Sequence, residues 1–124
     1  IAPFGSLEEL SDEDFQRLTA VNISAVYRVS KLASARLRNG GRVLNLSSAV
    51  TRVGVASALA YSATKGWVDS FTLSLASHLA PRDITVNAIA PGVIKTDMSD
   101  PMLAGGPDFI LGKQALKRIG QPED

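Results

Sequence analysis

Tyr61 and Lys65 stand four residues apart in a run from about Ser57 to Leu79 that favours a helix. Side chains at positions i and i+4 of a helix share one face, with Cβ atoms about 5–6 Å apart. A tyrosine phenol ordinarily ionises only near pH ~10, and a neighbouring positive charge favours its phenolate form. The pair can therefore act as a general acid or base, although an exposed pair on a solvated helix face would show the same spacing.

Two hydroxyl groups are expected at the end of a strand upstream of this pair. Residues 41–46 are typical of an aliphatic β-strand that a Gly-Gly turn opens. Ser47 and Ser48 follow at the end of this strand, ahead of the Tyr61 helix. In open α/β sheets ligands bind at the carboxyl ends of the strands. The two serines are therefore expected at the ligand-binding edge.

A polar residue interrupts the apolar stripe of an earlier helix. Ser11 is a good N-cap with acidic residues after it, and the helix is expected to run from there to the Gly-Gly stop at residues 40–41. Asn22 falls between Leu18 and Val26 on the apolar face. A buried amide needs hydrogen-bond partners. Asn22 therefore either serves a site or bonds to a neighbouring strand or to water.

A second strand is expected over residues 84–90, directly after the Tyr61 helix. Strand, helix and strand in this order form the βαβ pattern of a parallel sheet, so the fold class is α/β. Pro91 and Gly92 end the second strand. Glycine there permits close approach of the backbone to a ligand, and a plain strand-terminating turn would use the same residues. Residues 99–120 are interrupted by proline and glycine, as in a substrate-covering lid or an ordinary surface segment.

Composition limits the kinds of function. The chain has 124 residues, of which 45% are apolar and 20% charged, as in a globular domain. The net charge of +1 comes from interspersed signs, and no apolar run approaches the ~20 residues of a membrane span, so we expect no nucleic-acid or membrane partner. With no cysteine and one histidine, no metal site is expected. No secretory segment begins the chain, which favours the cytoplasm, although the chain starts at Ile1 and its true N-terminus can lie elsewhere.

Three motifs together resemble the short-chain dehydrogenase/reductase superfamily. They are Ser48, Tyr61 with Lys65 in a Tyr-x-x-x-Lys pattern, and the Pro-Gly-x-x-x-Thr loop at residues 91–96. The resemblance runs along nearly the whole chain and is nearest to members of the 3-oxoacyl-carrier-protein reductase and sugar-alcohol dehydrogenase type. It implies an oxidoreductase that uses NAD or NADP and a small-molecule carbonyl or alcohol substrate.

The resemblance also implies roles for single residues. Tyr61 would be the general acid/base, Lys65 would favour its phenolate, and both would contact the cofactor, Lys65 through the nicotinamide ribose. Ser48 would hydrogen-bond the reacting oxygen. Asn22 would disturb its helix and hold a water beside the lysine.

Further implied contacts concern the cofactor and a second subunit. The loop residues Pro91, Gly92, Ile94 and Thr96 would bind the cofactor, with the Ile94 backbone and the Thr96 hydroxyl holding its carboxamide. The Asn22 and Tyr61 helices would pack against the same helices of another copy. A homodimer or homotetramer is therefore implied.

No glycine-rich dinucleotide-binding turn occurs in the sequence. The chain resembles part of a Rossmann-like doubly wound parallel sheet with long flanking helices. Residues 1–124 are expected to form a single partial domain, the catalytic half, which alone would bind cofactor poorly and be inactive. Two other interpretations stay open: a non-catalytic module that dimerises through its helices, and a nucleotide-sugar epimerase or dehydratase, against which the Pro-Gly loop argues.

Overall fold

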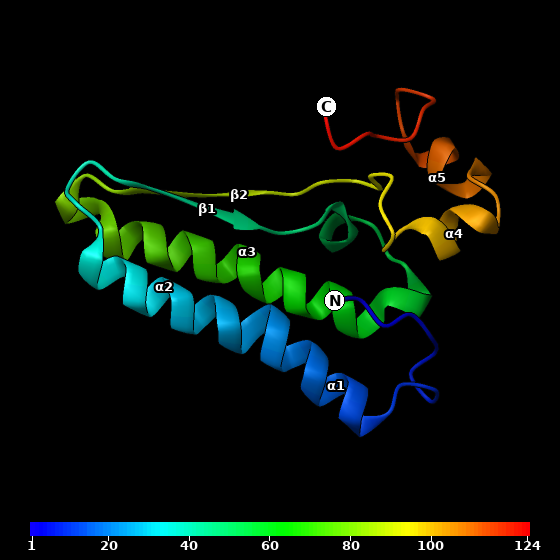
Figure 1. The fold of residues 1–124 in the computed structure, drawn as a ribbon, viewed down its shortest axis with the longest axis horizontal. Coiled ribbons are helices and arrows are strands. Elements are labelled where there is room, and N and C mark those ends of the chain that lie inside the picture. Colours follow the sequence, from blue (N-terminus) through cyan, green and yellow to red (C-terminus); the bar gives the residue numbers. More distant parts are fainter. The chain divides into compact units, whose positions relative to one another are not determined.

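The computed structural model describes all residues, 1–124, and they divide into two compact units, residues 1–90 and 91–124. The first unit contains a two-stranded parallel sheet and long helices, and the second contains two short helices (Figure 1). The α/β class predicted from the sequence is confirmed. No helix combines the length and the apolar character needed to cross a bilayer. The expectation of a single partial domain stays a prediction.

The first long helix is continuous but changes its winding in the middle. It comprises α1 (Asp12–Thr19), a π-helical turn (Ala20–Ser24) and α2 (Ala25–Arg36). Ser11 caps it as expected, because its Oγ accepts the N–H of Asp14 at 3.0 Å. The helix ends before the Gly-Gly stop, where Gly40 adopts a φ of 75° that favours glycine. The local disturbance implied for this helix is thus a π turn.

The two strands pair in parallel as the βαβ pattern predicts. β1 (Arg42–Leu46) pairs with β2 (Thr85–Ile89), with Val43 opposite Val86. β1 begins one residue later than the range 41–46 predicted for it, and β2 is one residue shorter than predicted at each end. α3 (Leu59–Leu79) connects the strands. The segment between β1 and α3 contains 3₁₀ turns at Ala49–Arg52 and Ala56–Ala58.

The core of the first unit lies between α3 and the sheet. α3 runs between the sheet and the α1–α2 helix (Figure 1). Leu79, Ile84 and Val86 form a buried cluster at the end of α3. Partly buried residues pack around this cluster; they are Leu37, Val43, Leu75 and Ala76. α3 contacts both the sheet and the α1–α2 helix, and these contacts fix the position of its first turns next to the sheet.

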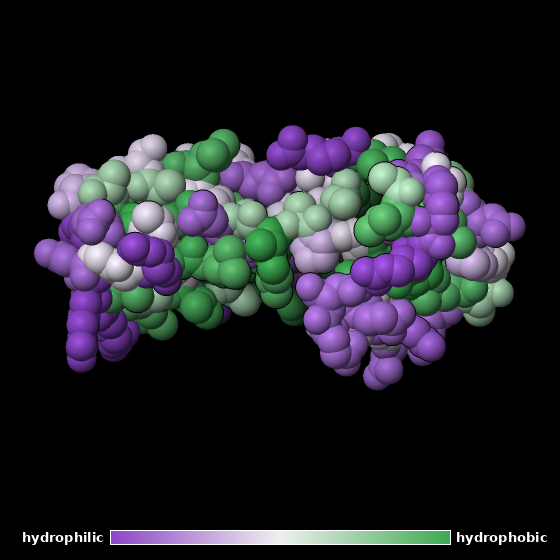
Figure 2. Space-filling model, turned by 90° about the horizontal axis from the view of Figure 1, so that it is seen from above, coloured by the Kyte–Doolittle hydropathy of each residue, from purple (hydrophilic) through white to green (hydrophobic).

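The opposite face of the sheet is open. Side chains alternate between the faces of a strand, and those pointing away from α3 include Leu44, Leu46 and Ile89, which are 62%, 60% and 45% exposed. Figure 2 views the molecule from above this face and shows hydrophobic residues in green on its surface. Val29 and Leu32 on α2 are also exposed, so the predicted apolar stripe is only partly packed.

The second unit consists of a loop and two short helices. α4 (Asp100–Ala104) and α5 (Asp108–Lys113) are separated by a turn in which Gly106 has a φ of 102°. A single parallel bridge joins Ile94 to Gly120. The interruption predicted for residues 99–120 is therefore present, in the form of two short helices.

Arg82 ties the turn after α3 to the end of α2. Its guanidinium donates to the carbonyl oxygens of Ser34 at 2.5 Å and Leu37, and to Asn39 Oδ1 at 3.3 Å. The last carbonyls of a helix have no partner within the helix, and cations there also favour the helix dipole. One arginine therefore satisfies acceptors at the end of α2 that would otherwise depend on water.

We predict that Arg82→Ala lowers the free energy of unfolding of the full-length protein by about 1–3 kcal/mol, because hydrogen bonds from a charged donor are lost. Arg82→Lys should recover only part of this, since a lysine lacks the planar fork. Arg36→Ala is the matched control, because Arg36 makes only one long bond of 3.4 Å, to Leu32 O of its own helix. Denaturant unfolding measures all three variants, and equal effects of Arg82→Ala and Arg36→Ala would contradict the proposed tie.

Candidate active site

Tyr61 and Lys65 lie on one face of the first two turns of α3, as their spacing predicts. The Lys65 Nζ is 5.7 Å from the centre of the Tyr61 ring. Both side chains are half-buried. The ring of Phe4 lies 6.3 Å from the Tyr61 ring, tilted by 53°. The Tyr61 ring therefore has both an aromatic side chain and a cation as neighbours.

The Lys65 amine reaches the end of β1. Its Nζ donates to the carbonyl oxygen of Leu46 at 2.8 Å. Burial lowers the pKa of Lys65, because the ammonium form loses contact with water. An ammonium has three donors, so one bond to Leu46 leaves two for other partners. The last residue of β1 and the second turn of α3 are therefore joined directly.

The two serines after β1 differ in their surroundings. Ser47 is 4% exposed, and its Oγ donates inward to Lys65 O at 3.5 Å. Ser48 is half-buried, and its Oγ accepts the N–H of Val50 at 3.3 Å as the cap of a 3₁₀ turn. The hydroxyl proton of Ser48 is not used in that bond. Of the two residues, Ser48 is the one with a donor to offer a ligand.

A short contact holds the Ser48 turn against the Tyr61 turn. Ser62 Oγ donates to the Val50 carbonyl oxygen at 3.2 Å. Ser62 follows Tyr61 directly, and Val50 lies in the 3₁₀ turn that Ser48 caps. The serine, the tyrosine and the lysine therefore belong to one end of the first unit.

Asn22 is buried in the π-helical turn, with 6% of its surface exposed. Its Nδ2 donates to Ile1 O at 3.0 Å and to Thr64 Oγ1 at 3.2 Å, and its Oδ1 accepts from Ile1 N at 3.3 Å. Its partners are thus the N-terminal segment and α3, rather than a strand. π turns inside helices occur frequently at functional sites.

Thr64 belongs to this network and was not singled out by the sequence reasoning. It is 2% exposed, and its Oγ1 donates to Tyr61 O at 2.7 Å while accepting from Asn22. The available signal was its place between Tyr61 and Lys65. A threonine there is equally typical of a buried helix face, so the sequence alone could not show that it meets Asn22.

In the second unit, Ser99 shapes the loop of residues 91–96. Its Oγ lies 2.8 Å from Ile94 O and 2.9 Å from Thr96 O, so its single proton can be donated to either carbonyl, and it accepts the Thr96 N–H at 3.0 Å. Lys95 N donates to Gly120 O at 2.9 Å. These bonds leave the Ile94 N–H and the Thr96 hydroxyl without a hydrogen-bond partner in the chain. Sequence reasoning did not identify Ser99.

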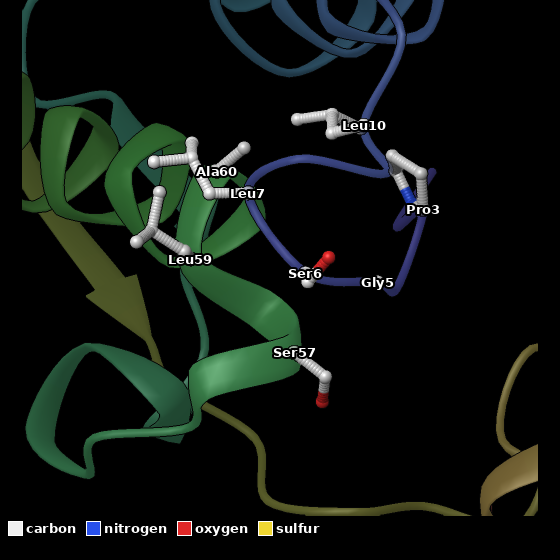
Figure 3. A pocket seen from close by; sticks show the side chains of 8 residues that line it. All are labelled: Pro3, Gly5, Ser6, Leu7, Leu10, Ser57, Leu59 and Ala60. Carbon is white, nitrogen blue, oxygen red and sulfur yellow. The ribbon is translucent and has the colours of Figure 1, made fainter.

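The structure brings four of the expected site residues together in the first unit: Asn22, Ser48, Tyr61 and Lys65. The other four, Pro91, Gly92, Ile94 and Thr96, lie together on the loop of the second unit. A small hollow in the first unit lies between the N-terminal segment and the start of α3 (Figure 3). Its volume of about 10 Å³ holds no more than one water.

Comparison with known proteins assigns the family. A family model described as enoyl-(acyl carrier protein) reductase matches residues 1–124. The chain belongs to the short-chain dehydrogenase/reductase superfamily. The resemblance drawn from the serine, the Tyr-x-x-x-Lys pair and the Pro-Gly loop is thereby confirmed.

Individual members of the superfamily are similar in sequence to almost the whole of this chain. An uncharacterized oxidoreductase of Methylorubrum extorquens is 36% identical over 98% of this chain and 50% of its own length. The 3-oxoacyl-[acyl-carrier-protein] reductase FabG of Pseudomonas aeruginosa is 35% identical over 95% of this chain and 49% of its own. The chain spans about half the length of the curated relatives it matches.

Solved structures of short-chain dehydrogenases share the fold. The crystal structure of a short chain dehydrogenase from Burkholderia cenocepacia in complex with NADP superposes with a TM-score of 0.88 and 35% identity. The match covers 98% of this chain and 49% of that one. The Rossmann-like assignment is confirmed for the part of the fold that this chain comprises.

We predict that Lys65 makes stability depend on pH in the alkaline range. Because burial lowers its pKa, the unfolded chain binds more protons than the folded chain between the lowered and the ordinary value. The free energy of unfolding then rises with pH across this interval. Burial of the charged amine destabilises the fold fully at pH values below the pKa of the folded chain. It no longer does so above the pKa of the unfolded chain, where the amine is neutral in both states.

The measurement is denaturant unfolding of the wild type and of Lys65→Met at a series of alkaline pH values. The free energy of unfolding of the wild type, relative to that of Lys65→Met, should increase as pH rises. A difference that does not change with pH would contradict the burial of the charge.

Proposed function

We propose that the protein is an NAD(P)-dependent oxidoreductase that transfers a hydride between a nicotinamide cofactor and a carbonyl or alcohol substrate. The observation that carries the proposal is the meeting of the Tyr61 ring and the Lys65 amine at the end of β1, beside the turn capped by Ser48. Membership of the superfamily and the similarity to FabG of Pseudomonas aeruginosa support it.

The residues present fit a nicotinamide nucleotide. Lys65 keeps two donors beyond its bond to Leu46 O, which suit the hydroxyls of a ribose. The Ile94 N–H and the Thr96 hydroxyl have no partner in the chain and suit a carboxamide, which both accepts and donates. The similar dehydrogenase of Burkholderia cenocepacia is in complex with NADP. A bound NAD or NADP would supply or accept the hydride at the substrate carbon.

Tyr61 is the general acid and base of the proposed reaction. In reduction its phenol gives a proton to the carbonyl oxygen, so that one hydride on carbon and one proton on oxygen make the alcohol. In oxidation the phenolate takes the proton from the alcohol. The Lys65 amine lies 5.7 Å from the centre of the Tyr61 ring, and the phenolate left after reduction regains its proton from solvent.

Ser48 and Asn22 support this proton transfer. Ser48 would donate its free hydroxyl proton to the substrate oxygen and stabilise the negative charge that develops there. Asn22 would hold a water in the proton path beside Lys65, from the π-helical turn where its amide is fixed. Pro91 and Gly92 would let the loop backbone approach the cofactor.

Association with a second copy is also part of the proposal. Exposed apolar side chains on α2 and α3 include Val29, Leu32 and Leu73, which are 66%, 58% and 73% exposed. Such surfaces favour contact with another protein surface. A homodimer or homotetramer built through these helices would cover them and would leave the proposed chemistry unchanged.

We predict that Tyr61→Phe in the full-length protein lowers kcat by about 10²–10⁴-fold, the contribution of a positioned acid or base. Phenylalanine keeps the ring that packs against Phe4, so the affinity for NADPH should stay within about twofold. Turnover is followed by NADPH absorbance with acetoacetyl thioesters and a panel of other ketones, and affinity by NADPH fluorescence. Retained turnover would remove the assignment of Tyr61.

We predict that Ser48→Ala lowers kcat by about 10²–10³-fold, as expected for one lost donor to an oxyanion. Ser47→Ala is the matched control, because Ser47 is buried and donates inward, and it should keep most of the turnover. The same absorbance assay measures both variants. The reverse order of effects would give the role to Ser47.

A further inference from the structure

Two buried threonines connect α3 to other elements in the same way. Thr64 and Thr72 are 2% and 5% exposed. Each hydroxyl donates to a carbonyl of its own helix and accepts from the side-chain amide of an asparagine elsewhere in the fold. The two pairs differ in position, since only one lies at the turn that carries Tyr61 and Lys65.

The directions of the bonds around Thr64 follow from its single proton. The Oγ1 donates to Tyr61 O at 2.7 Å, so it can only accept from Asn22 Nδ2 at 3.2 Å. The bonds of Asn22 to Ile1 agree with this, because Oδ1 receives the Ile1 N and Nδ2 gives to the Ile1 O. Thr64 therefore helps to fix which way the amide of the π-helical turn points.

The hydroxyl is also bonded to the backbone of the proposed catalytic tyrosine. A threonine that bonds back to a carbonyl of the preceding turn adjusts the local bend of its helix. The carbonyl in this case belongs to Tyr61 itself, and the residue after Thr64 is Lys65. Removal of this hydroxyl should therefore change the positions of Tyr61 and Lys65 and of the π turn together.

We propose that Thr64 is a positioning residue, whose hydroxyl sets the π-helical turn at Asn22 relative to the turn of α3 that bears Tyr61 and Lys65. The expected effect on turnover rests on the proposed function. The expected effect on the positions of these residues does not depend on it. Misplacement of a reacting group by about 1 Å can lower a rate by ~10²-fold, so loss of this link should reduce kcat more than it reduces binding.

Thr72 provides a matched control. Its Oγ1 donates to Val68 O at 2.8 Å and accepts from Asn45 Nδ2 at 2.8 Å. Like Thr64 it is buried and makes one bond of each kind, but it lies two turns further along α3. We expect the backbone of Asn45 to stay in place without this hydroxyl, because β1 pairs with β2 along its length.

The experiment compares Thr64→Val, Thr64→Ser and Thr72→Val in the full-length protein. Valine keeps the shape of threonine and removes the hydroxyl, whereas serine keeps the hydroxyl. Both valine variants should lower the melting temperature, since each leaves an asparagine amide donor with one bond fewer. Thr64→Val alone should lower kcat by about 10- to 100-fold with KM within about threefold, and Thr64→Ser should restore it.

A second readout does not depend on activity. The pH titration of Lys65, followed by NMR of ¹³Cε-labelled lysine, should move in Thr64→Val and stay unchanged in Thr72→Val and Thr64→Ser. Equal titration of Lys65 in the two valine variants overturns the proposal, whether or not the wild type turns over any ketone. A moved titration in a protein without turnover supports the positioning role and refutes only the proposed function.

Discussion

The site depends on one bond, from the Lys65 amine to the carbonyl oxygen of Leu46 at 2.8 Å. It joins the second turn of α3 to the last residue of β1, and the two salt bridges of the chain do not include it. Half-buried charge is unfavourable unless it is hydrogen-bonded or paired. A carboxylate would neutralise the amine, whereas a carbonyl orients it and leaves its charge available to the phenol and to a ligand. The site therefore keeps a partly buried positive charge, at some cost in stability, next to the phenol.

Topology explains why the chemistry gathers at this edge. The strands are parallel, so both end at the same edge of the sheet, and a helix that connects them must begin there. Residues early in α3, such as Tyr61 and Lys65, then lie close to residues directly after β1, such as Ser48. The short 3₁₀ turn capped by Ser48 fills the space between, and Ser62 fastens it to α3.

Local patterns in the sequence predicted much of this arrangement but not the hydrogen bonds between residues far apart in the chain. β1, the course of α3, the Ser11 cap and the burial of Asn22 follow from periodicity and turn residues within a few positions. The bond of Asn22 to Thr64 joins positions 42 residues apart and depends on how two helices pack. The side-chain partners of Asn22 in the π turn, Ile1 and Thr64, are also distant in the sequence and could not be inferred from a local pattern. Likewise, the apolar character of Val29 and Leu32 was readable, but their exposure was not.

The open face of the sheet bears on the site as well. Parallel sheets are stable when both faces are covered, and two strands alone are marginal. α3 covers one face, while Leu44, Leu46 and Ile89 remain exposed on the other. Leu46 is also the residue whose carbonyl holds Lys65, so any movement of β1 moves the amine. A layer that covers this face therefore does more than bury apolar area, because it limits the motion of the strand end against which Lys65, and through it Tyr61, is positioned.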